Sequence, residues 1–325
     1  MTIFVLFVLF FLLVLGGAWF AYSMSFYAPA SRRVTAEEPL KGEQYDAVAE
    51  HIFRMTHIME KIPFEEITIR SHDSLRLYGR YYHVRDGAPI EILFHGYRSH
   101  AFRDCSGGHA LSRKMGFNAL VVDQRAHGKS EGRTISFGIQ ERYDLLNWVR
   151  YCVSRFGSDS PIILSGLSMG AATVLMAADL ELPSNVKAII ADSPYSTPAA
   201  IIEKVCRDEK YPVALCRPFL YLAAWLYGGF HLNAASAKKA VSKATVPILL
   251  IHGEADHFVP CSMSHEIAAV CASPVTVQTY PEAGHGLCYM TDPRRYERDV
   301  CNFLLDLPEV GKQINDTFLK QLFIQ

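Results

Sequence analysis

The chain reads PIILSGLSMGAATVL from Pro161 to Leu175. The first four residues form an uninterrupted apolar run, typical of a short strand that is buried on both faces. The last five residues are apolar except for Thr173 and are compatible with a helix. Between them, Gly166 to Gly170 match G-x-S-x-G, which places Ser168 at a sharp strand-to-helix turn. Glycines on both sides of Ser168 remove the side chains that would block so tight a bend.

Short apolar runs alternate with helix-like segments on both sides of this turn. The strand-like runs are 90–94, 119–123, 162–165, 188–191, 248–251 and 275–280, and the helix-like segments are 101–115, 139–156, 171–178, 263–270 and 294–305. Apolar strands separated by helices indicate a mostly parallel sheet covered by helices on both faces. Residues 64–70 and 75–84 have period two around a polar turn and predict an antiparallel hairpin, and 45–61 has helical spacing.

One interval breaks this alternation. Residues 194–245 separate two strands and contain more than one helix-like stretch, of which 211–227 is apolar on most faces and rich in aromatic residues. The interval predicts a helical insertion. It either forms a lid over Ser168, with Phe219 and Trp225 against an acyl chain, or packs on the sheet.

The N-terminus is unusually apolar. Residues 3–22 contain no charged side chain, and about 20 residues make a helix of roughly 30 Å, enough to cross a bilayer core. No basic side chain precedes the run, which disfavours a cleaved signal peptide, although residues 28–30 (Ala-Pro-Ala) resemble a cleavage site. We expect a transmembrane anchor over 1–24, a linker over 25–44 and a catalytic domain over 45–325.

Basic residues follow this span. Arg32, Arg33 and Lys41 lie on its C-terminal side, where Glu37 and Glu38 dilute their charge. Because cytoplasmic flanks are enriched in lysine and arginine, the pattern favours a single-pass protein whose catalytic domain is cytoplasmic.

Composition excludes several function classes. The formal net charge is −1 and no long lysine or arginine run occurs, so a nucleic-acid partner has no electrostatic support. The eight cysteines include no C-x-x-C pair, which argues against a zinc ribbon or a thioredoxin-like motif.

Two later strand ends supply partners for Ser168. A serine hydroxyl needs a histidine base, itself oriented by a carboxylate, and both are expected at the carboxyl ends of later strands. Asp256 follows the run 248–251, and His285, between two glycines, follows the run 275–280. The order serine, acid, histidine predicts a catalytic triad, with Glu254 and His257 as neighbouring alternatives.

An oxyanion needs two backbone donors. Met169 follows the serine and begins a helix, whose N-terminal dipole favours negative charge. The second donor is expected in the loop after 90–94, where we choose Tyr97.

A second G-x-S-x-G surrounds Ser130, but it lies in a polar loop rather than at a strand-to-helix turn. Its Gly-Lys-Ser would need a glycine five positions before Gly128 to form a phosphate-binding loop, and that residue is Asp123. No H-E-x-x-H occurs either, so we expect neither a nucleotide cofactor nor a catalytic metal.

From about Phe64 to Leu305 the chain resembles the α/β-hydrolase superfamily, especially its serine aminopeptidase-like and acylglycerol lipase-like esterases. The matching blocks are 95–97, 123–130, 166–170, 252–260 and 284–285. The resemblance implies a serine hydrolase without a metal, and it implies that the Ser130 segment is a structural loop. We expect a small-molecule or lipid-like ester as the substrate, cleaved through an acyl-enzyme.

Other functions use the same residues. A peptidase, an aminopeptidase or an acyltransferase would employ the same triad, the last with an alcohol or amine in place of water. A non-catalytic binding protein on this fold is the less favoured reading, because such proteins usually lack a triad member, and all three are present here.

Overall fold

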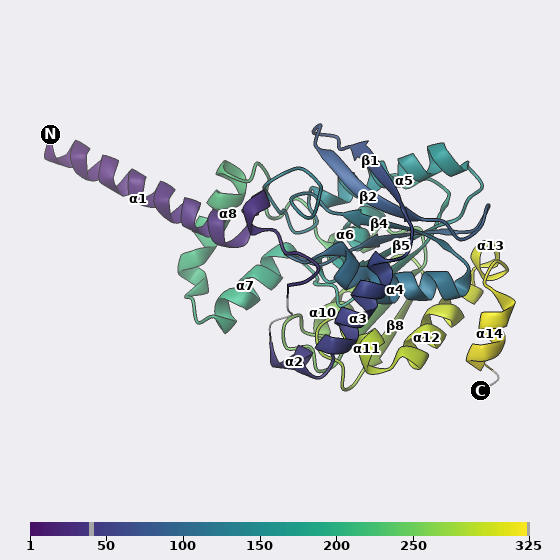
Figure 1. Cartoon of the computed structure of the whole chain (residues 1–325). Helices are drawn as coiled ribbons and strands as arrows, with labels where there is room; N and C mark the ends of the chain where they lie inside the picture. The colour runs from purple at the N-terminus through teal and green to yellow at the C-terminus, as the bar shows by residue number, and fades with distance from the viewer. Residues whose placement is uncertain (39–41, 324–325) are drawn as a thin grey trace.

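A computed structural model describes residues 1–38 and 42–323 of the chain (Figure 1). Lys41, one of the basic residues in the orientation argument, lies outside the described residues, as do positions 39–41 of the expected linker. The described residues form a sheet with helices on both faces. One long helix at the N-terminus projects away from this sheet.

Eight strands form one sheet in the order β1-β2-β4-β3-β5-β6-β7-β8. Their bounds are β1 Glu65–Arg70, β2 Arg76–Tyr82, β3 Ile90–Phe94, β4 Asn118–Asp123, β5 Ile162–Leu167, β6 Val186–Asp192, β7 Ile248–Gly253 and β8 Val275–Tyr280. Strand β2 is antiparallel to both β1 and β4, and every pairing from β4 to β8 is parallel. The expected hairpin and the mostly parallel sheet are therefore confirmed.

Helices flank this sheet. Before β3 they are α1 Thr2–Ser25, η1 Ala30–Arg32, α2 Glu43–Asp46 and α3 Ala49–Glu60; between β3 and β7 they are α4 Ala101–Met115, α5 Glu141–Phe156, α6 Met169–Met176, η2 Ala177–Asp179, α7 Pro198–Asp208, α8 Val213–Leu226 and α9 Ala237–Val241; after β7 they are α10 Ser262–Ala268, α11 Cys288–Thr291, α12 Pro293–Leu305, α13 Pro308–Gly311 and α14 Asp316–Phe323. Helices α11, α13 and α14 have no counterpart among the expected elements.

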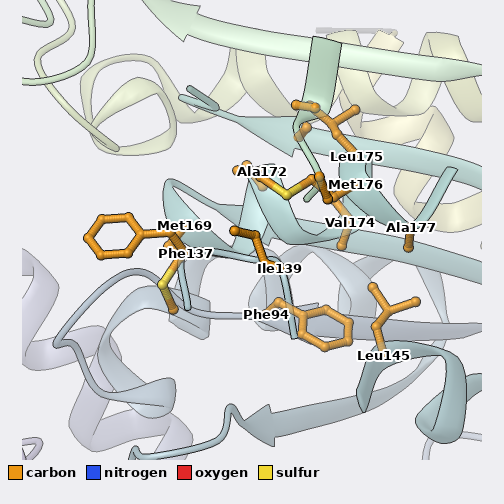
Figure 2. Close-up of a cluster of buried hydrophobic side chains, with 14 of the residues drawn as sticks. Phe94, Phe137, Ile139, Leu145, Met169, Ala172, Val174, Leu175, Met176 and Ala177 are labelled. Atoms are coloured by element: carbon orange, nitrogen blue, oxygen red, sulfur yellow. The ribbon is translucent and has the colours of Figure 1, made fainter. Parts of the chain in front are cut away.

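Successive residues of a strand point to opposite faces of the sheet. The side chains of the central strands therefore pack alternately into two hydrophobic cores, one on each face. Ile162 and Leu164 of β5 pack with α5 and α6, whereas Ile163 between them packs with α4 and α12. Figure 2 shows part of the first core, where Phe94 of β3 and Leu145 of α5 lie near the apolar residues of α6. Burial on both faces explains why these strands read as continuous apolar runs.

The insertion between β6 and β7 contains α7, α8 and α9, so its helical character is as expected. Leu220, Ala223 and Ala224 of α8 are buried in the main core, as the packing alternative expects, and α8 also packs against α1 (Figure 1). A side chain at Gly17 of α1 would come within 2.7 Å of the Phe219 ring, so the glycine permits this close approach. The Tyr227 hydroxyl also donates to the carbonyl of Leu15 at 3.2 Å.

The end of α1 and the residues after it belong to the core. Tyr22 and Phe26 are 2% and 0% exposed, and Phe26 packs edge-to-face against Phe137 and Phe230 at centroid distances of 5.8 and 5.3 Å. Further on, the Arg33 guanidinium donates to three loop carbonyls, which belong to Gly128, Ser130 and Gly132 at 2.7–2.9 Å. Residues 26–33, which the sequence suggests as part of a linker, are therefore packed on the domain.

Candidate active site

Ser168 stands at the turn between β5 and α6, as expected. Its backbone has φ 55° and ψ −113°, a strained conformation for a residue with a side chain. A Cβ on Gly166 would lie 2.3 Å from the carbonyl carbon of Gly170, and one on Gly170 would lie 2.1 Å from the Phe94 oxygen. Both positions of the motif therefore require glycine, because β5, α6 and β3 meet here.

The structure brings together the three residues of the expected triad. Asp256 follows β7 and His285 follows β8, at the edge of the sheet where β5 delivers Ser168. The His285 Nε2 atom lies 2.9 Å from the Ser168 Oγ atom, and His285 Nδ1 lies 2.7 Å from Asp256 Oδ2. All three residues are buried, with 4–9% of their surface exposed. The arrangement can relay a proton from the serine to the histidine, with the carboxylate fixing the ring.

Asp256 is held as an anion. Its Oδ1 atom accepts the backbone N–H groups of Phe258 and Val259 at 2.9 and 2.8 Å. Burial alone would raise the pKa of this carboxyl, but hydrogen bonding to His252, His285 and the Val259 N–H outweighs burial and holds the pKa well below its usual range. A carboxylate in this state can orient a histidine and balance its charge.

The alternative acids and bases lie elsewhere. Glu254 is exposed and accepts a hydrogen bond from the Thr279 hydroxyl at 2.6 Å. His257 is exposed. Asp192, at the end of β6, is buried, and burial raises its pKa to about 6. Its carboxylate accepts the Ser193 hydroxyl at 2.9 Å, and its backbone oxygen accepts the Ser168 N–H at 2.8 Å. Asp256 is thus the carboxylate hydrogen-bonded to the histidine ring.

The two expected oxyanion donors flank Ser168. Met169 is the first residue of α6, and Tyr97 lies in the loop after β3, which abuts the serine. A Cβ on Gly96 would be 3.5 Å from the Ser168 Cβ atom. Among residues 1–38 and 42–323, neither the Tyr97 nor the Met169 backbone N–H has a hydrogen-bond acceptor. Both residues therefore offer an unpaired backbone donor within the described part of the chain.

Ser130 has a different environment, although it also sits in a G-x-S-x-G motif. It is fully buried, its hydroxyl donates to the Asp123 carbonyl at 2.5 Å, and it accepts the Tyr78 N–H at 2.8 Å. The Asp123 carboxylate pairs with Arg80 at 2.8 Å. These contacts tie the loop after β4 to β2, so Ser130 has a structural role.

A cavity of about 330 Å³ opens at Ser168 and His285. Apolar residues of β3, α4, β5, β6 and the segment after β8 line much of it, including Leu93, Leu111, Leu167, Ile190, Leu287 and Met290. Among the described lining residues, none comes from 194–245. The alternative in which Phe219 and Trp225 contact an acyl chain therefore has no support from the cavity lining: Phe219 packs on α1, and Trp225 is 55% exposed.

Two residues at this cavity were missed by sequence reasoning. Gln44 and Tyr45 of α2 lie over the histidine loop, where Gln44 Oε1 accepts the His285 N–H at 3.0 Å and the Tyr45 hydroxyl donates to the His285 carbonyl at 3.4 Å. Burial, with Asp104 and Asp256 nearby, raises the pKa of Tyr45 to about 12, so its phenol stays protonated. These contacts join residues 240 and 241 positions apart, and no local pattern signals them.

One cluster of metal-ligand types occurs among the described residues: His72, Asp73 and Asp144. Arg125 already occupies it, with Nη1 3.0 Å from the Asp73 carboxylate and Nε 2.6 Å from that of Asp144. The guanidinium balances the charge of both acids, so the cluster is explained as an ion-pair network.

The mostly parallel sheet, its flanking helices and the serine turn after β5 define an α/β-hydrolase. Residues 89–228 and 219–292 match the model of the serine aminopeptidase S33 family. The chain belongs to this family and is a hydrolase.

Other proteins are similar to this chain in sequence or in fold. The Bacillus subtilis protein YqkD, described as uncharacterized, is 26% identical over 286 residues, which cover 84% of this chain and 88% of that protein. The Pyrococcus furiosus esterase Pf2001 superposes with a TM-score of 0.62 at 22% identity, covering 76% of this chain and 92% of the esterase. Est1E from Butyrivibrio proteoclasticus, solved with ferulic acid, has a TM-score of 0.56 at 22% identity, with 74% and 98% covered.

Proposed function

We propose that this protein is a serine hydrolase that cleaves carboxylic esters through an acyl-enzyme, with Ser168, His285 and Asp256 as its catalytic triad. The observation that carries the proposal is the unbroken hydrogen-bond chain from Ser168 Oγ through both nitrogens of the His285 ring to Asp256 Oδ2, at 2.9 and 2.7 Å. It meets the geometric requirement for a nucleophile, its base and the group that orients the base.

In the first half of the reaction, Ser168 Oγ attacks the ester carbonyl carbon while its proton passes to His285 Nε2. The carbonyl oxygen becomes an oxyanion that accepts the N–H groups of Tyr97 and Met169. When the tetrahedral intermediate collapses, the carbon–oxygen bond to the alcohol breaks and His285 returns the proton to that leaving oxygen. Water then repeats the sequence on the acyl-enzyme and releases the carboxylic acid and free Ser168.

The cavity supports an ester with an apolar acyl group. Its volume of about 330 Å³ is at the lower end of the range for small-molecule sites. Of the two structural neighbours, Pf2001 is named an esterase and Est1E was solved with ferulic acid bound. Esters are therefore the first substrates to test.

The test is a panel of p-nitrophenyl esters of increasing acyl length, run beside aminoacyl anilides and acyl thioesters on the full chain. We expect kcat/KM to rise with chain length by about 0.8 kcal/mol per buried methylene until the cavity is full, and to fall for longer chains. Faster turnover of the anilides would instead identify a peptidase. Transfer of the acyl group to an added alcohol in preference to water would identify an acyltransferase.

We also propose that α1 is an uncleaved membrane anchor. It is a 24-residue helix with a mean hydropathy of 2.8. Only 6% of its most apolar stretch is buried against the rest of the protein. At 1.5 Å per residue, the helix is roughly 36 Å long. Cleavage near residues 28–30 would remove Tyr22 and Phe26 from the core, which supports retention of the helix. Arg32 and Arg33 on the domain side favour a cytoplasmic orientation.

The insertion offers a second apolar surface beside this anchor. Leu215, Pro218, Leu222 and Trp225 recur at intervals of three and four along α8, so they share one face. Leu215 and Trp225 are 62% and 55% exposed. Because α8 crosses α1 near Gly17, a bilayer that holds α1 would also contact this face, and we propose that α8 lies in the same leaflet.

Tryptophan fluorescence tests the position of α8. The chain has three tryptophans, of which Trp148 is 1% exposed in the core. In vesicles with brominated acyl chains, we expect strong quenching in the Trp19→Phe variant, whose Trp225 would face lipid. The matched variant Trp19→Phe with Trp225→Phe should be almost unquenched, because only the core tryptophan emits. Equal quenching in both variants would place α8 outside the bilayer.

A further inference from the structure

The last turn of α1 contacts the loop that carries one of the two oxyanion donors. The Tyr97 hydroxyl donates to the Ser25 carbonyl at 2.8 Å, and Arg98 Nη2 donates to the carbonyls of Met24 and Tyr27 at 2.9 and 3.2 Å. The last carbonyls of a helix have no partner within the helix, and its C-terminal end favours a cation. The loop thus supplies the capping donors that α1 lacks.

The loop itself depends on such contacts. Arg98 has φ +47°, in the left-handed region that a residue with a side chain rarely adopts. Its backbone N–H donates to His127 Nε2 at 3.0 Å, and the Gly96 N–H donates to the Asp104 carboxylate at 2.8 Å. The Tyr97 backbone N–H lies between these two anchors. A strained residue next to it persists only where the surroundings hold it in place.

The end of α1 is in turn fixed to the domain. The Tyr22 hydroxyl lies 2.6 Å from Thr134 Oγ1, and the Phe26 carbonyl accepts the Ile135 N–H at 2.8 Å. One aromatic residue links the two sides, because Phe137 packs on Phe26 and stacks on the Tyr97 ring at a centroid distance of 4.9 Å. The helix end, the loop after β4 and the oxyanion loop therefore form one packed unit.

We propose that the last turn of α1 positions the oxyanion hole: its backbone carbonyls hold Tyr97 and Arg98 so that the Tyr97 N–H points to the reacting carbonyl oxygen. The inference rests on the proposed hydrolase function and extends it to the helix that precedes the hydrolase fold. An oxyanion donor works at 2.7–3.1 Å from the developing charge, so a small displacement of the loop weakens it. The Tyr97 side chain is a positioning group, and α1 is part of the active-site framework as well as an anchor.

The test compares two tyrosine-to-phenylalanine substitutions. Tyr97→Phe keeps the ring on Phe137 and the backbone N–H but removes the hydrogen bond to Ser25. Tyr227→Phe is the matched control, because it also removes a phenol hydroxyl that donates to an α1 carbonyl, in this case that of Leu15. Tyr227 follows α8 and is not part of the oxyanion loop, whereas Tyr97 is. Both are measured in the full chain with a short p-nitrophenyl ester, and kcat is normalised by fluorophosphonate titration of the active serine.

We expect Tyr97→Phe to lower kcat about tenfold with KM nearly unchanged, less than the roughly 10²–10³-fold cost of losing a donor outright. The same variant should bind a trifluoromethyl ketone about tenfold more weakly, because the ketone adds to the serine and leaves an oxyanion in the hole. Adding Arg98→Met should deepen both losses. Tyr227→Phe should keep both values within about twofold.

Three results would overturn the inference. The first is a double variant, Tyr97→Phe with Arg98→Met, whose kcat and affinity for the ketone equal those of the wild type. The second is a loss that disappears on normalisation to titrated serine, which would mean that α1 contributes to folding alone. The third is an equal loss in Tyr227→Phe. Failure of the proposed function looks different, because the wild type would then neither hydrolyse the ester nor react with the fluorophosphonate.

Discussion

Replacing Ser168 with alanine is expected to lower kcat by about 10⁴-fold or more, because the substitution leaves only binding and oxyanion stabilisation. The substitution removes one hydroxyl from a buried turn and creates no clash, so the folded structure should be retained. Activity is measured on the best ester of the panel, and a fluorophosphonate probe should label the wild type and leave the variant unlabelled.

Ser130→Ala is the matched control for this substitution. It alters the other G-x-S-x-G serine, whose hydroxyl bonds the Asp123 carbonyl and the Tyr78 N–H. Losing these bonds should cost about 1–3 kcal/mol of folding stability and leave kcat and labelling nearly intact. If the Ser130→Ala variant were inactive and unlabelled while the Ser168→Ala variant stayed active, the assignment of the nucleophile would be reversed.

Asp256→Asn is expected to lower kcat by up to about 10⁴-fold. The carboxylate accepts a hydrogen bond from His285 Nδ1–H at 2.7 Å, which leaves Nε2 unprotonated and able to take the proton of Ser168. An amide in its place stabilises the wrong tautomer and offers no charge to the imidazolium. The loss should fall on kcat rather than on KM, because the interaction strengthens as the histidine becomes charged.

Glu254→Gln serves as the control for this prediction. It makes the same chemical change two residues away, at an exposed carboxylate that accepts a hydrogen bond from Thr279. We expect its kcat to stay within about twofold of wild type. Comparable losses in the two variants would contradict the assignment of Asp256 as the orienting acid.

Much of the sheet could be predicted because its strands are buried on both faces and carry a simple signal. The runs 90–94 and 275–280 coincide with β3 and β8, and the helix expected over 101–115 coincides with α4. The triad candidates followed from the same signal. Parallel strands place their carboxyl ends at one edge, so polar residues after β5, β7 and β8 meet there.

Contacts between distant segments left no such signal. Residues 26–33 fall within the expected linker 25–44, yet Phe26 is fully buried and Arg33 binds three loop carbonyls. Gln44 ends the expected linker and Tyr45 begins an expected helix, although both contact the His285 backbone. Each contact depends on how the N-terminal segment crosses the finished sheet, which hydrophobic periodicity does not encode.

The insertion shows a different limit. A helix that is apolar on most faces fits a substrate wall, a protein core or a membrane surface equally well by composition. In the structure this helix has three different environments, because Ala223 and Ala224 are buried in the core, Phe219 packs on Gly17, and Leu215 and Trp225 are exposed. The sequence predicted the helix but left open whether it forms a lid or packs on the sheet.

The central claim is that Ser168 forms a covalent acyl-enzyme, and trapping that intermediate tests it most directly. The full-length Asp256→Asn variant is mixed with a p-nitrophenyl ester, quenched with acid, digested and examined by mass spectrometry. We predict one acyl group on the peptide that contains Gly166 to Gly170, with fragmentation placing it on Ser168. An acyl group on Ser130 or another residue, or ester turnover without any covalent adduct, would contradict the account.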